Sequence, residues 1–282
     1  SFCKIHGART GNILFQYLAA KLLSLKYGHT YVWIEHPNLF PNPNTGIITV
    51  TDDNIVPLLS SGNPKIRDYN IICRGYFQLS EIFIQNREIL LDAIRNCDDW
   101  WIGVNGEKEW IRTFFECEHN SGVLTEKDIV ISLRLDDFIQ SHASTSDIIS
   151  PHYYLTLLEK YKISNCIERV FIVCDKIRYG WEEEYLKFFT KWKPIIIQGT
   201  LLNDCAVMRD CHVLFHSNST LCWFMSFIST SKICRYIPNT GFNKNQKLGV
   251  IEEQKDVLLD VKPMSHSSVY ELNYAKYLGE LA

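Results

Sequence analysis

The sequence lacks the marks of several protein classes. Its formal net charge is only −3 over 282 residues, without long runs of one sign, so nothing predicts a nucleic-acid footprint or a polybasic membrane patch. Apolar runs such as Ile129–Ile131 and Val213–Phe215 are much shorter than the roughly 20 residues that a transmembrane helix needs. We therefore expect a soluble segment with neither nucleic acid nor membrane as a partner. Because Ser1–Ile5 reads as part of a strand, an upstream anchor or further domain stays open.

Motifs of several enzyme classes are also absent. The sequence has no Gly-x-Ser-x-Gly elbow of a serine hydrolase, no Walker A loop and no Gly-x-Gly-x-x-Gly fingerprint. It also has no Asp-x-Asp, the metal-binding element of many glycosyltransferases. If the chain is a glycosyltransferase, side chains and helix dipoles must therefore stabilise the leaving diphosphate. We expect no metal and no other cofactor.

Cysteine is abundant, but its pattern is not that of a disulfide scaffold. The ten cysteines lie mostly in apolar strand-like or helical stretches, which predicts reduced core thiols and favours a cytoplasmic location. No Cys-x-x-Cys pair exists, so we predict no structural zinc site. The cysteines are Cys3, Cys73, Cys97, Cys117, Cys166, Cys174, Cys205, Cys211, Cys222 and Cys234.

Strand-like and helical patterns alternate through the first half of the chain. Apolar residues repeat at helical spacing over Asn12–Leu25, and Gly28 ends this predicted helix. Proline and glycine punctuate a loop at Phe40–Gly46. The other predicted elements are strands at 2–6, Thr30–Ile34 and Ile71–Phe77 and helices at Glu81–Cys97 and Lys108–Cys117.

Hydrophobic periodicity is lost over Glu118–Lys127, the best candidate for a linker. After it, short apolar strands alternate with helices, which predicts a parallel sheet covered on both faces, as in a Rossmann-like nucleotide-binding domain. We therefore predict an α/β protein with an N-terminal domain at 1–122, a nucleotide-binding domain at 123–263 and a C-terminal helix at 264–282. The predicted strands are Ile129–Leu133, Arg169–Cys174, Pro194–Ile197, His212–Phe215 and Lys232–Tyr236, and the helices Pro151–Lys162, Trp181–Lys191, Leu202–Met208 and Ser217–Ser229.

Ligands of a parallel α/β sheet bind beyond the carboxyl ends of its strands, so polar residues that follow apolar runs are candidates for a site. Arg134 comes directly after a buried strand, where its planar guanidinium suits a diphosphate. The alternative is a structural ion pair between Arg134 and Asp137. Asp175 ends another strand and suits a ribose or purine, unless it is merely solvated.

Two further stretches are candidates for an anion site. Gly7–Asn12 forms a glycine turn between the first strand and helix, and a simple connection is the alternative. His216–Thr220 leads into a helix, where Ser217 or Asn218 is a credible N-cap and the helix N-terminus favours phosphate. Capping without a ligand is the alternative there. The Asn218-Ser-Thr glycosylation pattern is set aside because a strand-to-helix turn is not the exposed loop that this modification needs.

The order of these motifs resembles that of the bacterial α1,2-fucosyltransferase family, within the α1,2-, α1,6- and protein O-fucosyltransferase superfamily. The resemblance spans about residues 5–240. Gly11–Tyr17 resembles the family's Gly-Asn-Gln-(apolar)-Phe-Gln-Tyr, Arg74–Gln78 its Gly-Tyr-Phe-Gln, Ser132–Phe138 its His-x-Arg-Arg-Gly-Asp-Tyr, Val173–Asp175 its Phe-Ser-Asp-Asp, and His216–Trp223 its Asn-Ser-Ser-Phe-Ser-Trp-Trp.

The resemblance implies an inverting, metal-independent transferase of GT-B-like fold, whose two Rossmann-like domains bind a glycan acceptor and GDP-fucose. It implies that Arg134 grips the β-phosphate, and we place Asp137 in the catalytic site. The implied donor-side residues are Arg9, Gly11, Asn12, Ser132, Asp175, Ser217, Asn218, Ser219 and Thr220, and the acceptor-side residues are Gln16, Tyr76 and Gln78.

The chain departs from the family pattern at the residues around Arg134. Ser132 replaces a histidine that relatives associate with guanine, Leu135 replaces a second arginine, and Asp136 replaces a glycine. Two alternatives therefore stand beside GDP-fucose transfer. One is the same scaffold with another nucleotide sugar, such as a UDP- or GDP-linked deoxyhexose or pentose. The other is a glycan- or nucleotide-binding protein without catalysis.

Overall fold

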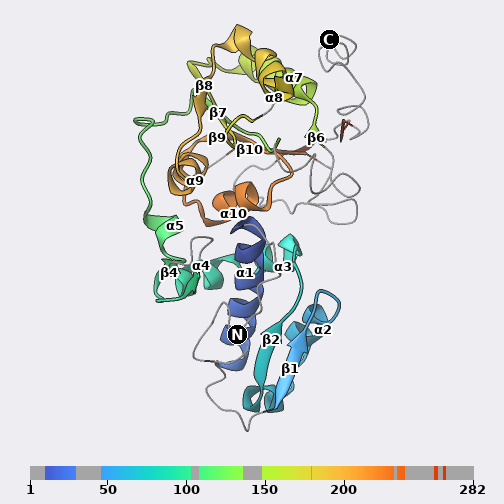
Figure 1. Ribbon diagram of the computed structural model, residues 1–282. Helices are drawn as coiled ribbons and strands as arrows, with labels where there is room; N and C mark the ends of the chain where they lie inside the picture. Colours follow the sequence, from blue (N-terminus) through green and yellow to red (C-terminus); the bar gives the residue numbers. More distant parts are fainter. Residues whose placement is uncertain are drawn as a thin grey trace. The chain divides into compact units, whose positions relative to one another are not determined.

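The computed structural model describes residues 10–29, 46–102, 108–135, 148–178, 180–231, 234–238, 257–259 and 263–264. The chain forms two compact units, Ser1–Glu116 and Cys117–Ala282 (Figure 1). The predicted strands at 2–6 and Thr30–Ile34 lie outside the described residues. The predicted C-terminal helix at 264–282 also lies outside them, except that Met264 belongs to a strand.

The first unit combines a two-stranded parallel sheet with several helices. Strands β1 and β2 pair in parallel, with Ile48 opposite Ile71, and β3 and β4 pair antiparallel. In chain order its elements are α1 (Thr10–Tyr27), β1 (Ile47–Val50), α2 (Ile55–Ser60), the 3-10 helix η1 (Pro64–Asp68), β2 (Asn70–Cys73), α3 (Ser80–Gln85), α4 (Arg87–Arg95), β3 (Trp100–Ile102), β4 (Lys108–Trp110) and α5 (Thr113–Glu116).

Helix α1 runs through the core of this unit and is buried on nearly all sides. Two of its buried polar side chains share one partner, since Tyr17 Oη and Lys21 Nζ both donate to Asp99 Oδ2, at 2.8 and 2.7 Å. The helix ends at Gly28, whose φ of +71° is the left-handed conformation that terminates helices. The predicted helix and its end are therefore confirmed.

Two predicted helices of the first unit are wrong in part. The helix at Glu81–Cys97 is two helices, because Asn86 leaves helical geometry at φ −113° and ψ 19° and its Nδ2 donates to Ile82 O at 2.8 Å. The helix at Lys108–Cys117 begins instead as strand β4, which pairs Trp110 with Trp100. Aromatic residues favour such pairing, and a partner ten residues earlier in the chain decides it.

The second unit is built on a six-stranded, all-parallel sheet in the order β11-β10-β9-β5-β7-β8. This confirms the predicted parallel α/β sheet and is compatible with a Rossmann-like fold. Its elements are β5 (Asp128–Ser132), β6 (Ile148–Ile149), α7 (Pro151–Ser164), β7 (Arg169–Val173), α8 (Gly180–Lys187), η2 (Thr190–Trp192), β8 (Ile195–Ile197), α9 (Leu201–Asp210), β9 (Val213–Phe215), α10 (Thr220–Ile228), β10 (Cys234–Pro238), β11 (Val257–Leu259) and β12 (Pro263–Met264).

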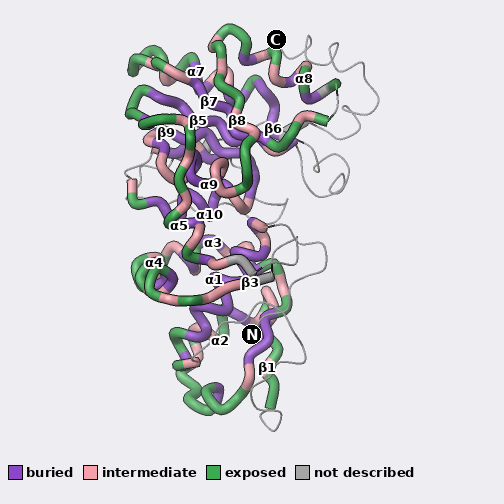
Figure 2. Tube along the Cα trace, turned by 60° about the vertical axis from the view of Figure 1, so that its left-hand side comes forward, coloured by how far each residue is buried: buried purple, intermediate pink, exposed green. Residues whose placement is uncertain are grey.

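Helices cover both faces of this sheet (Figure 1). Ile129 and Ile131 pack in one cluster with residues of α7 and α8, whereas α9 contacts β5 and β7. All five residues of β5 are buried, and Figure 2 shows the central strands as the buried interior of this unit. Strands buried on both faces read as continuous apolar runs, which is why the sequence predicted them well.

One charged group anchors the start of β5. Asp128 is buried, and its carboxylate accepts from Arg169 Nε at 2.8 Å and Nη2 at 2.6 Å. Burial opposes ionisation of Asp128, but the hydrogen bonds from Arg169 and Thr125 outweigh it and hold the pKa of this carboxyl below its ordinary value. The ion pair therefore joins the first residues of β5 and β7.

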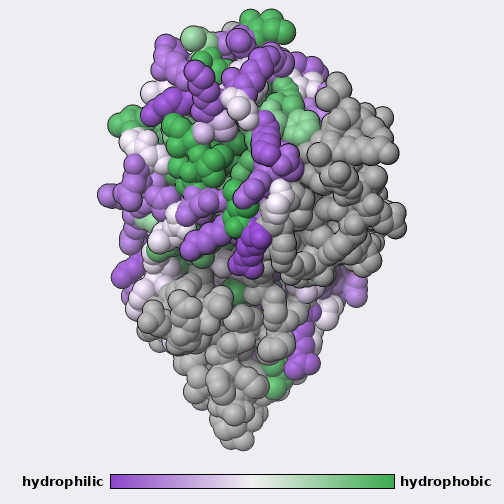
Figure 3. All heavy atoms as spheres, turned by 45° about the horizontal axis from the view of Figure 1, so that its top comes forward, coloured by the Kyte–Doolittle hydropathy of each residue, from purple (hydrophilic) through white to green (hydrophobic). Residues whose placement is uncertain are grey.

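The surface and the cysteines complete the description. In the coloured part of the face drawn in Figure 3, hydrophilic side chains surround a hydrophobic area. Among the described residues, no helix combines the length and apolar character needed to span a membrane. The nine cysteines whose structure is described are free thiols, and Cys3 lies outside the described ranges.

Candidate functional site

The chain reverses its direction of travel across the sheet of the second unit. It moves from β5 to β7 and β8 on one side, and then returns to β9 on the other side of β5 before continuing to β10 and β11. The reversal therefore lies between β5 and β9. In open parallel sheets, such a reversal leaves a crevice at the carboxyl ends of the two strands, where ligands bind.

Two predicted donor-side serines meet at this reversal. Ser132 is the last residue of β5, Ser217 follows β9, and their Oγ atoms lie 3.3 Å apart. Both side chains are buried, at 5% and 1% exposure. Tyr154 of α7 lies 3.4 Å from the carbonyl oxygens of both Ser132 and His216, to which its hydroxyl donates. The serines therefore join the two strand ends, and we call this buried contact the floor of the reversal.

Helix α10 begins directly at this floor. Its N-cap is Ser219, whose side chain accepts from Cys222 N at 3.4 Å. The prediction that Ser217 or Asn218 is the N-cap is wrong, because the Ser217 hydroxyl is bonded to Ser132 and Asn218 lies outside the first turn. The start of α10 leaves backbone N–H groups and the positive end of the helix dipole at the reversal.

Two titratable groups next to the floor, His216 and Cys222, are neutral, and a buried arginine acts on both. His216 is fully buried, and its Nε2 lies 2.8 Å from Ser226 Oγ. Burial, assisted by the charge of Arg235 on β10, holds the pKa of His216 well below its ordinary value. Burial also raises the pKa of Cys222 to about 12, so this thiol is no thiolate nucleophile at neutral pH. Arg235 is 0% exposed and gives this region a positive charge.

Arg134 and Thr220 are the predicted phosphate-side residues with accessible surface. Arg134 lies two residues past the end of β5, Thr220 is the first residue of α10, and both are half-buried. Asn218 and Ser219 are buried. The reversal thus has an arginine, a helix N-terminus and buried hydroxyls near it in the chain, a combination that suits a phosphorylated ligand. Sequence patterns predicted Arg134 and the serines but missed His216 and Arg235.

Asp175 lies past the carboxyl end of β7, one strand away from the reversal. Its side chain is exposed, and its backbone oxygen accepts from Gln198 Nε2 at 3.0 Å. Asp204 of α9 is a second carboxylate near it. Burial raises the pKa of Asp204, hydrogen bonds from Gly199 and Asn203 oppose this rise, and the charge of Asp175 adds to it.

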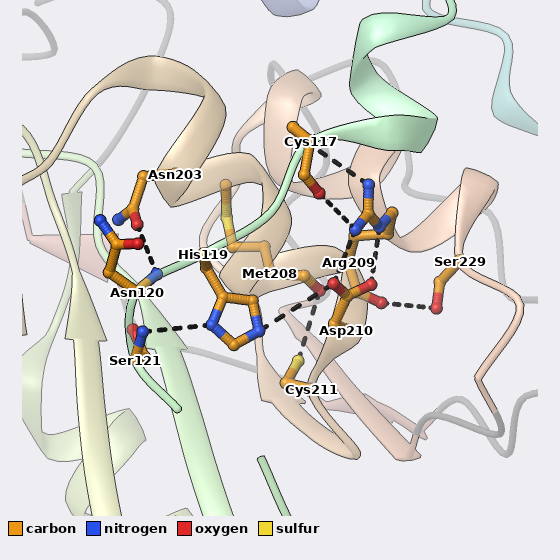
Figure 4. A network of polar contacts seen from close by, with 10 residues as sticks. All are labelled: Cys117, His119, Asn120, Ser121, Asn203, Met208, Arg209, Asp210, Cys211 and Ser229. Atoms are coloured by element: carbon orange, nitrogen blue, oxygen red, sulfur yellow. Dashed lines mark hydrogen bonds and ion pairs between the residues drawn. The ribbon is translucent and has the colours of Figure 1, made fainter. Parts of the chain in front are cut away.

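Arg209 has a structural role and fastens the start of the second unit to α9 (Figure 4). Its Nη2 donates to Cys117 O at 2.7 Å and to Asp210 Oδ2 at 2.6 Å, and its backbone oxygen accepts from Ser229 Oγ at 2.6 Å. Asn120 N donates to Asn203 Oδ1 at 3.1 Å in the same network. The sequence left Arg209 without a role, and the structure assigns it to this anchor.

The first unit brings the predicted acceptor-side residues Gln16 and Gln78 together with Asn12, which is predicted to be donor-side. Gln78 Nε2 donates to Asn12 Oδ1 at 3.0 Å, and Gln16 Nε2 donates to Gly75 O at 2.9 Å. The motifs Gly11–Tyr17 and Arg74–Gln78, more than fifty residues apart, therefore form one local cluster. Gly11 is buried in the first turn of α1, and Tyr76 is 42% exposed. Arg9 and Asp137 lie outside the described residues.

Two histidines have a spacing that is typical of metal ligands on a helix, but here they lie on either side of a strand. His212 and His216 are four residues apart, but β9 lies between them, and four residues of extended strand span about 13 Å. They are therefore much farther apart than two residues one turn apart on a helix, too far to ligate one metal ion. Among the residues that the structure describes, no group of three or more histidine, cysteine, aspartate or glutamate side chains could hold a metal ion.

Comparison of the chain with family models, with curated proteins and with solved structures finds no match.

Proposed function

We propose that the chain is an inverting fucosyltransferase that transfers fucose from GDP-fucose to a hydroxyl of a glycan acceptor without a metal. The observation that carries the proposal is the reversal between β5 and β9, where Ser132, Ser217 and the start of α10 meet and Arg134 follows β5. The proposal includes a GT-B-like arrangement, with the donor on the second unit and the acceptor on the first.

In this mechanism an acceptor hydroxyl attacks the anomeric carbon while the bond from that carbon to the diphosphate oxygen breaks. Negative charge then grows on the leaving GDP. Arg134 and the first N–H groups of α10 neutralise this charge, and the buried charge of Arg235 adds a favourable field. The proton of the hydroxyl passes to a carboxylate base.

A second candidate is the same scaffold with another nucleotide sugar. The observation that favours it concerns Ser132, which stands where relatives have a guanine-associated histidine. Its hydroxyl is buried and lies 3.3 Å from Ser217 Oγ, so it faces the interior rather than a base. The diphosphate clamp does not depend on this position, whereas the choice of nucleotide does.

Ligand-dependent stabilisation separates these candidates. Thermal unfolding is measured with GDP, UDP, GDP-fucose and UDP sugars, because a ligand that binds the folded state raises the midpoint. The proposal expects stabilisation by GDP and GDP-fucose, with donor hydrolysis or transfer that survives EDTA. Stabilisation by UDP alone refutes the GDP-fucose assignment and supports the second candidate. Stabilisation without hydrolysis or transfer identifies a binding protein, and loss of turnover in EDTA refutes metal independence.

A further inference from the structure

An aspartate that the sequence did not predict holds the loop that presents Tyr76. Asp52 follows β1, and its carboxylate accepts two consecutive backbone N–H groups of the loop after β2. Tyr76 N donates to Asp52 Oδ2 at 3.1 Å and Phe77 N donates to Asp52 Oδ1 at 2.6 Å. Hydrogen bonds to an ionised acceptor are among the stronger ones in proteins. The loop is therefore fixed at two adjacent peptide groups.

The loop needs this support because its backbone is strained. Phe77 has φ +50°, a left-handed conformation that is rare for a bulky residue and persists only where surrounding contacts enforce it. Gly75 is required by the same contact, since a Cβ at this position would lie 2.3 Å from Asp52 Oδ2. Gly75 and the carboxylate of Asp52 therefore determine the shape of the loop together.

Asp52 is itself held in place, and the loop has a second support. Asn54 Oδ1 accepts from Thr51 N at 2.8 Å, and Asn54 Nδ2 donates to Thr49 O at 3.2 Å, which fixes the turn that carries Asp52. On its other side the loop is bound to α1 through Gln16 and Gly75. Contacts from two elements therefore determine where the loop residues point.

The shaped loop directs alternate side chains inward and outward. Phe77 is 0% exposed and anchors the loop, whereas Tyr76 is 42% exposed. Gln78 follows two residues after Tyr76, is half-buried and donates to Asn12 Oδ1. A loop that carries an exposed aromatic ring and an amide suits a saccharide, because a ring packs on C–H groups and an amide binds hydroxyls.

We infer that Asp52 is a positioning residue for the glycan acceptor, which it serves by holding Tyr76 and Gln78 in a preformed saccharide platform. The inference rests on the proposed function, since it makes this platform the acceptor side of a glycosyl transferase. Asp52 acts through the loop and does not touch the reacting atoms. Its effect should fall on acceptor recognition more than on donor hydrolysis, because the proposed diphosphate clamp, Arg134 and the start of α10, belongs to the second unit.

The test compares Asp52→Asn with Asp53→Asn. The amide at position 52 is isosteric but turns an N–H₂ group toward a backbone N–H, whereas Asp53 is exposed and its change removes the same charge. Acceptor KM is measured with a panel of methyl glycosides of galactose, glucose, mannose and N-acetylglucosamine. We expect Asp52→Asn to raise acceptor KM about tenfold or more while donor hydrolysis without acceptor stays within about twofold. Asp53→Asn should change neither.

Two results overturn the inference. One is an unchanged acceptor KM in Asp52→Asn, and the other is an equal loss of transfer and donor hydrolysis, which indicates general damage. Tyr76→Ala serves as a second variant in case Asp52→Asn does not fold. It removes an exposed ring and should also raise acceptor KM. An unchanged KM there refutes the platform.

Failure of the proposed function is distinguishable from failure of this inference. If the wild-type chain neither binds nor hydrolyses any nucleotide sugar, the proposed function is refuted. Intrinsic fluorescence titration with the same methyl glycosides then measures the platform directly. Weaker binding by Asp52→Asn and Tyr76→Ala than by wild type supports it, and equal or absent binding in all three overturns it.

Discussion

The two candidate half-sites are built in opposite ways. In the second unit, regular strands and a helix bring Ser132, Ser217 and Thr220 to the reversal, and each residue takes its place from the element that it ends or begins. In the first unit, an irregular loop carries Tyr76 and is shaped by Asp52 from another segment. The backbone of the first half-site is positioned by strand pairing, whereas the backbone of the second depends on single side-chain contacts.

Arg134→Ala is the largest expected effect and tests the regular half-site. Loss of a group that stabilises transition-state charge typically costs about 10²–10³-fold in rate. We expect transfer to fall at least about 100-fold while the thermal midpoint is unchanged, as measured by initial rates and thermal unfolding. Arg134→Lys, which keeps the charge but loses the planar fork, should recover only part of the activity. If Arg134→Ala retains more than a tenth of wild-type activity, the diphosphate clamp is wrong.

The ion pair at the opposite end of β5 from the half-site should contribute to the stability of the second unit. Asp128→Ala removes a buried carboxylate from Arg169, whose side chain is 35% exposed, so the loss should lie between that of exposed and buried pairs, at about 2 kcal/mol. Denaturant unfolding measures this loss. Lys127→Ala is the matched control, because its pair with Glu168 is exposed on both sides and removal should cost under about 1 kcal/mol. Equal losses in the two variants contradict the assignment.

The same pair predicts a pH dependence. The pKa of Asp128 is lower in the folded state than in the unfolded chain, so its contribution is complete above the ordinary carboxyl pKa of about 4. That contribution is lost as the pH falls through the lower, folded pKa. Unfolding free energies between about pH 2 and pH 6 should therefore fall more steeply on the acid side for wild type than for Asp128→Asn. Parallel curves refute this prediction.

Substitutions of Ser219 have the smallest expected effect, and they separate the stability of the fold from phosphate binding. Ser219→Ala removes the N-cap of α10 and should cost about 1 kcal/mol. Ser219→Asp keeps a capping oxygen and should preserve stability, but it places a negative charge where we propose that phosphate binds. GDP should then fail to raise the thermal midpoint of Ser219→Asp. A normal GDP shift in this variant argues against phosphate at the start of α10.

The sequence predicted the regular half of the molecule better than the irregular half. Strands β5, β7 and β9 lie within a few residues of their predicted positions, because apolar runs buried on both faces leave a strong pattern. The N-cap of α10 was predicted one or two residues too early. Ser217, Asn218 and Ser219 all precede the helix, and each is a plausible cap. The break at Asn86 and strand β4 were missed, since each depends on geometry or pairing beyond local propensity.

By itself, the sequence determined the α/β class, the parallel sheet of the second unit, the end of α1 at Gly28 and the polar residues that follow each strand. Only the tertiary structure decided which strands are neighbours, and with it the reversal between β5 and β9 and the contact between Ser132 and Ser217, which are 85 residues apart. It also decided that Asp52 shapes the Tyr76 loop across 24 residues of chain. Periodicity records burial along one segment, but strand order and loop support arise from packing between distant segments, which no local pattern encodes.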